Sequence, residues 1–299
     1  MKRREFVKTG LVGIVAASTL NGFDLLYSQE NIPDAVWVEN GEPEQLLQSA
    51  LNEFGGLQKF INKGDVVVIK PNIGWDRAPE YAANTNPDLI KAIVQECYKV
   101  GAKTVKIFDR TCNNKQRCYK NSKIQEMAED AGADVSHMRK NKYVEIPIKD
   151  SKSVDSWPIY KDYLEADKVI NIPIAKHHSL SRVSLGMKNL MGVMGGNRGS
   201  IHSGFNEKLI DINKEIQPTL TIIDAYRILT ANGPQGGNLS HVQLKKTLIA
   251  SSCIVTADYL ALDLFGHKLD EVGHIKEAVN RGLNKFDLNK LNVKKVVLS

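Results

Sequence analysis

The chain has 299 residues, of which 42% are hydrophobic and 25% are charged, and its formal net charge is +6 at pH 7. Residues 1–28 carry +2 of that charge, and in the rest of the chain Lys and Arg are scattered among Asp and Glu without a run of five or six like charges. This distribution argues against a nucleic-acid or membrane partner of the folded part. After residue 28, about 270 residues remain, enough for one large domain or two small ones with a substantial core.

Residues 1–28 resemble a twin-arginine export signal. Arg3 and Arg4 precede Glu-Phe-Val-Lys and then a moderately apolar run from Thr9 to Leu20. That run is too short to span a bilayer, which needs about 20 apolar residues, and it has the charged-then-apolar order of an export signal. The resemblance implies transient contact with the twin-arginine export machinery, and a periplasmic location or membrane anchoring by an uncleaved signal. An ordinary basic N-terminal helix is the alternative, and the cleavage position stays open.

The chain has four cysteines, too few for a disulfide framework. Cys97 and Cys253 lie in apolar stretches and are most simply buried residues. Cys112 and Cys118 lie in a polar loop, where they either form a local disulfide in an oxidising compartment or stay free. No CxxC occurs, so no intrinsic iron–sulfur cluster or structural zinc site is expected.

The order of apolar runs predicts the secondary structure. Residues 29–64 predict a linker, from Gln29 to Glu44, and a lead-in helix. From residue 65 onward, short β-branched runs alternate with amphipathic ones, which is typical of strands joined by helical crossovers. The strands expected are Val66–Lys70, Thr104–Asp109, Ala133–Met138, Tyr143–Ile148, Lys168–Ile174, Thr219–Asp224, Leu244–Ala250 and Leu291–Leu298, and the helices are Asn86–Val100, Asn121–Ala131, Val183–Met194 and Val255–Gly266.

This pattern predicts an α/β fold with a mostly parallel sheet built from βαβ units. Two arrangements of residues 65–299 fit it equally. Lobes 65–165 and 166–299 could enclose a shared cleft, or all strands could join one long sheet.

Polar residues follow the expected strands, where ligands bind in open α/β sheets. They are Lys70 and Asn72, Asp109 and Arg110, Lys176 with His177 and His178, and Asp224. Turns also need polar residues, and Asn72 and Asp224 are the easiest to explain in that way.

The densest constellation lies between Asn171 and His202. It places Lys188 and Arg198 around a turn that contains Gly192, Gly195, Gly196 and Gly199. Glycines let a backbone approach a ligand closely and turn its N–H groups toward an anion. Phosphate or carboxylate is the expected ligand, and a flexible connecting loop is the alternative.

The histidines also suggest a divalent metal, since imidazole is a common ligand for transition metals. The predicted set is His178, His202, Asp224 and Asp263. Neighbouring residues of a strand face opposite sides, so only one of His177 and His178 reaches a given site. Histidines solvated on a loop are the alternative. Asp258 is expected to cap its own helix.

Several motifs together resemble the domain of unknown function family 362. The pieces are VVIKPN (67–72), NTNP (84–87), IFDR (107–110), INIPIAKHH (170–178), SLGMKNLMGVM (184–194), IIDA (222–225), NGP (232–234) and ASSCIVTADYLALDLFG (250–266). The family is often found with iron–sulfur modules and in twin-arginine-exported proteins. The resemblance implies an α/β domain of undetermined chemistry, with an iron–sulfur or redox partner protein as a further expectation. Its pattern falls on Lys70, Asn72, Asn86, Lys176, His178, Lys188, Asn189, Asp224 and Asp263. Many relatives carry a cysteine-rich cluster segment that this chain lacks.

Two functional hypotheses follow. The first is an exported enzyme for a small anionic substrate, with or without a divalent metal, in which Lys176, His177 and His178 are catalytic. The substrate-binding residues expected are Lys70, Asn72, Asn86, Arg110, Lys188, Asn189 and Arg198. The second is a non-catalytic module that binds an anion, a metal or a redox partner with the same residues. In both, the two halves of the chain are expected to build one anion-binding cleft together.

Overall fold

The computed structural model describes residues 32–299. The predicted signal segment, with Arg3 and Arg4, lies outside the described residues. The strands are β1 (Ala35–Glu39), β2 (Val66–Pro71), β3 (Thr104–Ile107), β4 (Asp134–Val135), β5 (Tyr143–Pro147), β6 (Ser156–Tyr160), β7 (Lys168–Ile172), β8 (Ile174–His178), β9 (Arg182–Ser184), β10 (Leu220–Leu229), β11 (Val242–Ser251) and β12 (Val293–Val297). The α-helices are α2 (Pro43–Glu53), α3 (Pro87–Lys99), α4 (Lys115–Asn121), α5 (Ile124–Asp130), α6 (Lys161–Leu164), α7 (Gly186–Asn189), α8 (Phe205–Glu215), α9 (Ile254–Leu260) and α10 (Gly273–Asn280).

Strands from both halves of the chain join one central sheet in the order β12-β1-β11-β10-β7-β2-β3-β4, with β8 and β9 attached beside β10. The pairs β2–β3, β2–β7, β7–β10 and β3–β4 are parallel, whereas β11 runs antiparallel to both β1 and β10. The predicted α/β fold with a mostly parallel sheet is thus confirmed. The strands β5 and β6 form a separate antiparallel pair.

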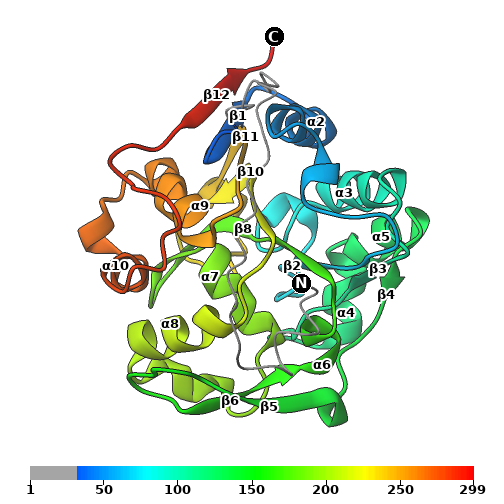
Figure 1. Cartoon of the computed structure of the whole chain (residues 1–299). Coiled ribbons are helices and arrows are strands. Elements are labelled where there is room, and N and C mark those ends of the chain that lie inside the picture. The colour runs from blue at the N-terminus through cyan, green and yellow to red at the C-terminus, as the bar shows by residue number, and fades with distance from the viewer. Residues whose placement is uncertain (1–31) are drawn as a thin grey trace, which may run out of the picture.

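Helices cover both faces of the sheet, and Figure 1 shows α2, α3 and α5 on one side and α8, α9 and α10 on the other. The alternation of β2 explains the two layers. Val67 and Ile69 point into the core beneath α2 and α3, while Val68 points into the core of α8 and α9. Because both faces are buried, β2 is a continuous apolar run. Among residues 32–299, no helix is long and apolar enough to cross a bilayer.

The segment predicted as a linker contains strand β1. Its residues Ala35–Val38 are buried between β11 and β12. The linker prediction rested on Pro33 and on Gly41-Glu42-Pro43, and it overlooked the short β-branched and aromatic run that separates them.

The run from Val183 to Met194 is not one helix. It divides into β9, the single turn α7 and the 3₁₀ helix η4 (Leu190–Val193). Likewise, Val255–Gly266 divides into α9 and the 3₁₀ helix η7 (Ala261–Phe265). Apolar spacing of three to four residues is compatible with any of these tight turns, so it did not distinguish them from a continuous helix.

Candidate functional site

A cleft of about 430 Å³ lies where β2, β3 and β8 end. Its lining residues come from both halves of the chain and are Asn72, Gly74, Trp75, Asp109, Arg110, Cys112, Lys176, His178, Ser184, Lys188, Asn189, Met191, Gly192, Arg198, Gly199, His202 and Pro234. This is the edge at which open parallel sheets bind ligands. Of the predicted site residues, Asn72, Arg110, Lys176, His178, Lys188, Asn189, Arg198 and His202 lie together here.

Lys70 lies beneath this cleft. Its side chain is fully buried, and its Nζ lies 2.9 Å from Oδ1 of Asp109, the residue that lines the cleft after β3. Burial alone would lower the pKa of Lys70, and the Asp109 carboxylate acts in the opposite direction. Since the charge of Lys70 is already paired, its role here is to hold Asp109 and Asn189 in place, the latter at 3.5 Å from Nζ.

Lys176, on β8, is buried at 1% exposure, and its Nζ donates to the carbonyl oxygen of Ala83 and, at 3.3 Å, to Oδ1 of Asn72. Burial, together with the charges of Lys188 and Lys70, lowers the pKa of Lys176 to about 7. A neutral amine has two N–H bonds and one lone pair. With both N–H bonds donated, the lone pair is left to accept a proton.

Lys188, on α7, is only 9% exposed, yet no carboxylate lies within ion-pair distance of it among the described residues. Its Nζ contacts the Met191 sulfur at 3.8 Å and lies 4.8 Å from the centre of the Phe205 ring. Burial, followed by the nearby guanidinium of Arg198, lowers the pKa of Lys188 to about 8. A buried ammonium with so little compensation is unfavourable unless an anion joins it.

Arg198 and Arg110 add two guanidinium groups to the lysines that line the cleft. Its guanidinium donates to the carbonyl oxygen of Arg110 at 2.8 Å and reaches the sulfur of Cys112 at 3.5 Å. Arg110 in turn donates to the carbonyl oxygens of Met194 and Gly196. Both side chains are thus held in position before a ligand arrives, which reduces the entropy that binding must remove.

The two adjacent histidines face different surroundings. His178 lines the cleft, whereas Nδ1 of His177 accepts from the backbone N–H of Gly233 outside it. Burial, together with Lys188 and Lys176, lowers the pKa of His178 to about 3. Its Nδ1 accepts from the N–H of Leu180 at 3.1 Å, so the neutral ring carries its proton on Nε2. His178 is therefore a hydrogen-bond donor in the cleft, and the expected catalytic role of His177 has no support from its position.

The predicted metal set is not assembled. His178 and His202 line the cleft, but the buried carboxylate of Asp224 accepts from the backbone N–H groups of Asn86 and Tyr226 instead. Asp263 is exposed on η7 and does not line the cleft. Within residues 32–299 no group of three or more His, Cys, Asp or Glu side chains is arranged to hold a metal ion.

Asn86 and Asp258 each cap a helix end or turn other than in the role predicted for them. The side chain of Asn86 caps α3 by accepting from the N–H of Asp88 at 2.9 Å. Asp258 does not cap its own helix. Its carboxylate accepts from Gly186 and Met187, at the start of α7, which positions the turn that bears Lys188.

The predicted disulfide is not formed, and Cys112 and Cys118 are both free thiols. They have different partners. Cys118 is buried on α4, with its sulfur 3.8 Å from the carbonyl oxygen of Gly74, while the sulfur of the exposed Cys112 accepts from the Arg198 guanidinium at 3.5 Å.

The glycines of the turn 192–199 were predicted to let the backbone approach an anion, and at Gly192 the structure gives a different reason for a glycine. A Cβ at Gly192 would lie 1.9 Å from Oδ1 of Asp109 and 2.6 Å from Nζ of Lys70, so this glycine admits the buried ion pair rather than a ligand. Of the four glycines, Gly192 and Gly199 line the cleft. Residues that sequence reasoning missed are Trp75, Ser184, Met191 and Pro234. The last three lie in the family motifs 184–194 and 232–234, which could have indicated them, whereas Trp75 lies outside the motifs.

The model of a family described as "Domain of unknown function (DUF362)" matches residues 67–263. The thylakoid-associated protein sll1697 of Synechocystis sp. is 26% identical over 226 residues, which are 73% of this chain and 68% of that protein.

Two solved structures are more distantly similar. The lactate racemase apoprotein from Thermoanaerobacterium thermosaccharolyticum matches with a TM-score of 0.47 at 15% identity over 84% of this chain. A protein from Thermotoga maritima matches with a TM-score of 0.42 at 10% identity over 75% of this chain. The chain spans 60% and 59% of the lengths of these two proteins.

Proposed function

The chain belongs to the family of the domain of unknown function 362, and we propose that it is an enzyme that acts on a small anionic substrate in the cleft. The observation that carries the proposal is Lys188, a buried ammonium that faces a cleft of about 430 Å³ and has no carboxylate partner among the described residues. Asp109 is the one carboxylate among the lining residues of this described cleft, and Lys70 already pairs with it. A phosphate or carboxylate group of a substrate would supply the negative charge that pairs with Lys188 and Arg198.

The different pKa values of Lys188 and Lys176 support catalysis rather than binding alone. With a pKa of about 8, Lys188 is mostly charged at pH 7 and binds the anion. Lys176, with a pKa of about 7, exchanges its proton readily at the same pH. A general base or acid works best when its pKa lies near the operating pH. Perturbed groups that converge on one cleft are typical of active sites.

The roles follow from the hydrogen bonds. Lys188 and Arg198 bind the anionic group, the Nε2–H of His178 donates to a second oxygen of the substrate, and Lys176 moves a proton to or from it. Asn72 holds Lys176 through its Oδ1 and donates to Asn189 through its Nδ2 at 3.2 Å. Asn72 and Asn189 are therefore positioning residues.

Export belongs to the proposal as well. Arg3 and Arg4 before an apolar run support transport by the twin-arginine route, with action in the periplasm or on the membrane surface.

The test is consumption of a metabolite. Wild-type protein is incubated with a small-molecule extract of its host, and the anionic metabolites are followed by mass spectrometry. A metabolite consumed by wild type should persist with Lys176→Gln and with Lys188→Ala. Lys103→Ala is the matched control, because Lys103 is exposed and precedes β3, at the opposite ends of the strands. Retention of a metabolite without consumption by wild type would instead identify a binding module.

A further inference from the structure

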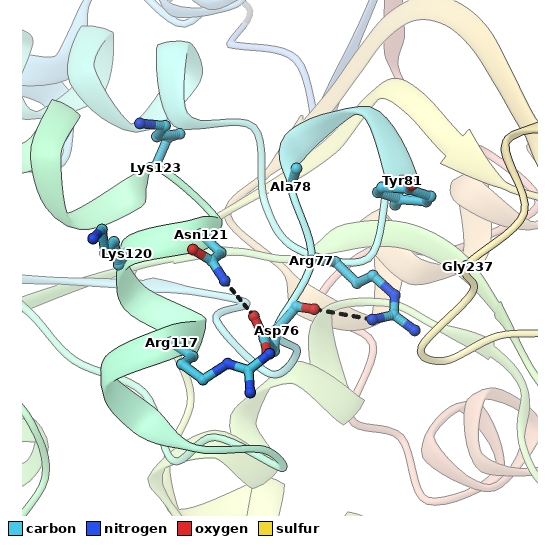
Figure 2. A pocket seen from close by; sticks show the side chains of 9 residues that line it. All are labelled: Asp76, Arg77, Ala78, Tyr81, Arg117, Lys120, Asn121, Lys123 and Gly237. Carbon is cyan, nitrogen blue, oxygen red and sulfur yellow. Dashed lines mark hydrogen bonds and ion pairs between the residues drawn. The ribbon is translucent and has the colours of Figure 1, made fainter.

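A second pocket, of about 620 Å³, lies on the other side of the segment that follows β2. Trp75 of this segment lines the cleft, whereas the next residues, Asp76 and Arg77, line the second pocket. Figure 2 shows its side chains, which come from this segment, from α4 and from the turn before α5. The lining residues are Asp76, Arg77, Ala78, Tyr81, Arg117, Lys120, Asn121, Lys123 and Gly237.

Cations outnumber anions in this pocket. Arg77, Arg117, Lys120 and Lys123 line it, against the single carboxylate of Asp76 within the described structure. Asp76 pairs with Arg117 at 2.6 Å, and Lys123 pairs with the exposed Glu126 at 3.1 Å outside the lining. Nζ of Lys120 has no hydrogen-bond or ion-pair partner in the described part of the chain.

Of these cations, Arg77 has a buried N–H group without a partner in the described residues and can therefore donate it to a ligand. Its Nη1 donates to the carbonyl oxygen of Asp76 at 3.1 Å, and its buried Nε has no partner among residues 32–299. The backbone on which it sits is fixed by Asn84, whose Nδ2 donates to the carbonyl oxygens of Trp75 and Arg77 and whose Oδ1 accepts from the N–H of Trp75. The backbone of Arg77 is therefore fixed at the pocket, and its guanidinium lies 6.0 Å from the centre of the Tyr81 ring.

Gly237 and residues of α4 form further parts of the pocket lining. Gly237 has φ +130°, which only glycine adopts readily, and a Cβ there would lie 3.3 Å from Nη2 of Arg77. On the α4 side, Arg117, Lys120 and Asn121 are three and four residues apart and so share one helix face. Asn121 is tied to Asp76 by a hydrogen bond of 2.5 Å.

We propose that this pocket is a second anion-binding site, distinct from the cleft, for a ligand that carries two or more phosphate groups. The volume lies within the roughly 300–1,000 Å³ of small-molecule sites, more than a single phosphate fills. The cations come from two separate parts of the lining, Arg77 from the segment after β2 and Lys120 from α4, and Figure 2 shows them on opposite sides of the pocket, so two phosphate groups can engage the two sides separately. Guanidinium groups bind phosphate with two parallel hydrogen bonds, and Lys120 adds a point charge.

Isothermal titration with pyrophosphate at pH 7 and low salt tests the proposal. Wild type should bind at two sites. Arg77→Gln and Lys120→Glu should each weaken one of them about tenfold or more, since each removes a charge-assisted contact. Lys188→Ala should leave that site and weaken the other, so failure of the cleft is distinguishable from failure of this pocket. Lys103→Ala should change neither.

Lys120→Glu keeps the test independent of folding, because Lys120 is exposed and has no partner in the described residues. Equal affinities in wild type and Lys120→Glu, or loss of all binding in Lys188→Ala alone, would overturn the proposal. Co-sedimentation with vesicles that contain cardiolipin, a lipid whose headgroup carries two phosphates, separates two sources of the phosphates. Sedimentation that Lys120→Glu abolishes assigns them to lipid headgroups, and its absence, with pyrophosphate binding retained, assigns them to a soluble ligand.

Discussion

The Nζ of Lys70 and Oδ1 of Asp109 lie 2.9 Å apart, directly against the Cα of Gly192. The pair joins three segments that are distant in the sequence: the end of β2, the end of β3 and the turn after α7. Oδ2 of Asp109 accepts from the N–H of Ile73 at 2.6 Å, so the carboxylate also fixes the loop behind the cleft. The floor of the cleft therefore depends on a residue with no side chain at position 192.

Gly192→Ala should destabilise the fold by about 3 kcal/mol or more, because the new methyl group must separate a buried ion pair. Urea unfolding measures the change. Gly199→Ala is the matched control, since a Cβ there would meet only the Asn197 side chain, at 3.3 Å. Equal unfolding midpoints for the two variants would show that the turn can move away from Lys70.

Anion binding in the cleft should weaken as the pH rises. Lys188 has a pKa of about 8, below its ordinary value, so it is charged at pH 7 and largely neutral at pH 9. Sulfate is a suitable probe because its own charge is constant over this range. Wild type should bind sulfate less tightly at pH 9 than at pH 7, whereas Lys188→Arg should keep its affinity. Calorimetry in buffers of different ionisation enthalpy should show proton uptake on binding, and no uptake would contradict the role of Lys188.

Lys176 should make stability depend on pH in the alkaline range. Its folded-state pKa, about 7, lies below the unfolded value, so between pH 7 and pH 9 the unfolded chain binds more protons and stability rises. Lys176→Met removes this contribution, so the difference in unfolding free energy between wild type and variant should shift by about 2 kcal/mol in favour of wild type from pH 7 to pH 9. A pH-independent difference would mean that Lys176 keeps its charge when buried.

Asp258→Ala should cost about 2 kcal/mol or more, since it leaves the buried N–H groups of Gly186 and Met187 without an acceptor. Asp258→Asn keeps one acceptor oxygen and should cost less. Thermal unfolding of the two variants checks the order. A melting temperature of Asp258→Asn at or below that of Asp258→Ala would contradict the prediction, because it would show that the retained acceptor oxygen does not stabilise α7.

Replacing Arg3 and Arg4 with lysine should retain the protein in the cytoplasm, because Lys does not reproduce the guanidinium pair of a twin-arginine signal. Fractionation of host cells shows where the variant accumulates. Lys2→Arg is the matched control, because it also exchanges one basic side chain for another without changing the charge. Unchanged export of the double variant would exclude this route.

The fold class and much of the cleft could be predicted from sequence because both depend on local patterns. Buried parallel strands read as short β-branched runs, and the residues after such strands meet at one edge. This is why Asn72, Lys176 and Lys188, more than 100 residues apart at the extremes, were expected in one cleft and lie in one.

The carboxylates were harder to predict because their partners are distant backbone groups. Asp224 accepts from Asn86, 138 residues away, and Asp258 from Gly186, 72 residues away. Neither pairing leaves a trace in local spacing. The sequence therefore offered Asp224 as a metal ligand and Asp258 as a local cap, when each carboxylate is already occupied by amides.

Strand β1 has a consequence for the order in which the protein is built. It lies between β11 and β12, whose residues begin at Val242 and Val293. A ribosome synthesises β1 near the start, but neither neighbour exists until most of the chain has emerged. The apolar segment Ala35–Val38 therefore stays unpaired until β11 has been made, and its second partner, β12, comes later still. Of the strands in residues 32–299, the first to be made is thus among the last to be paired on both sides.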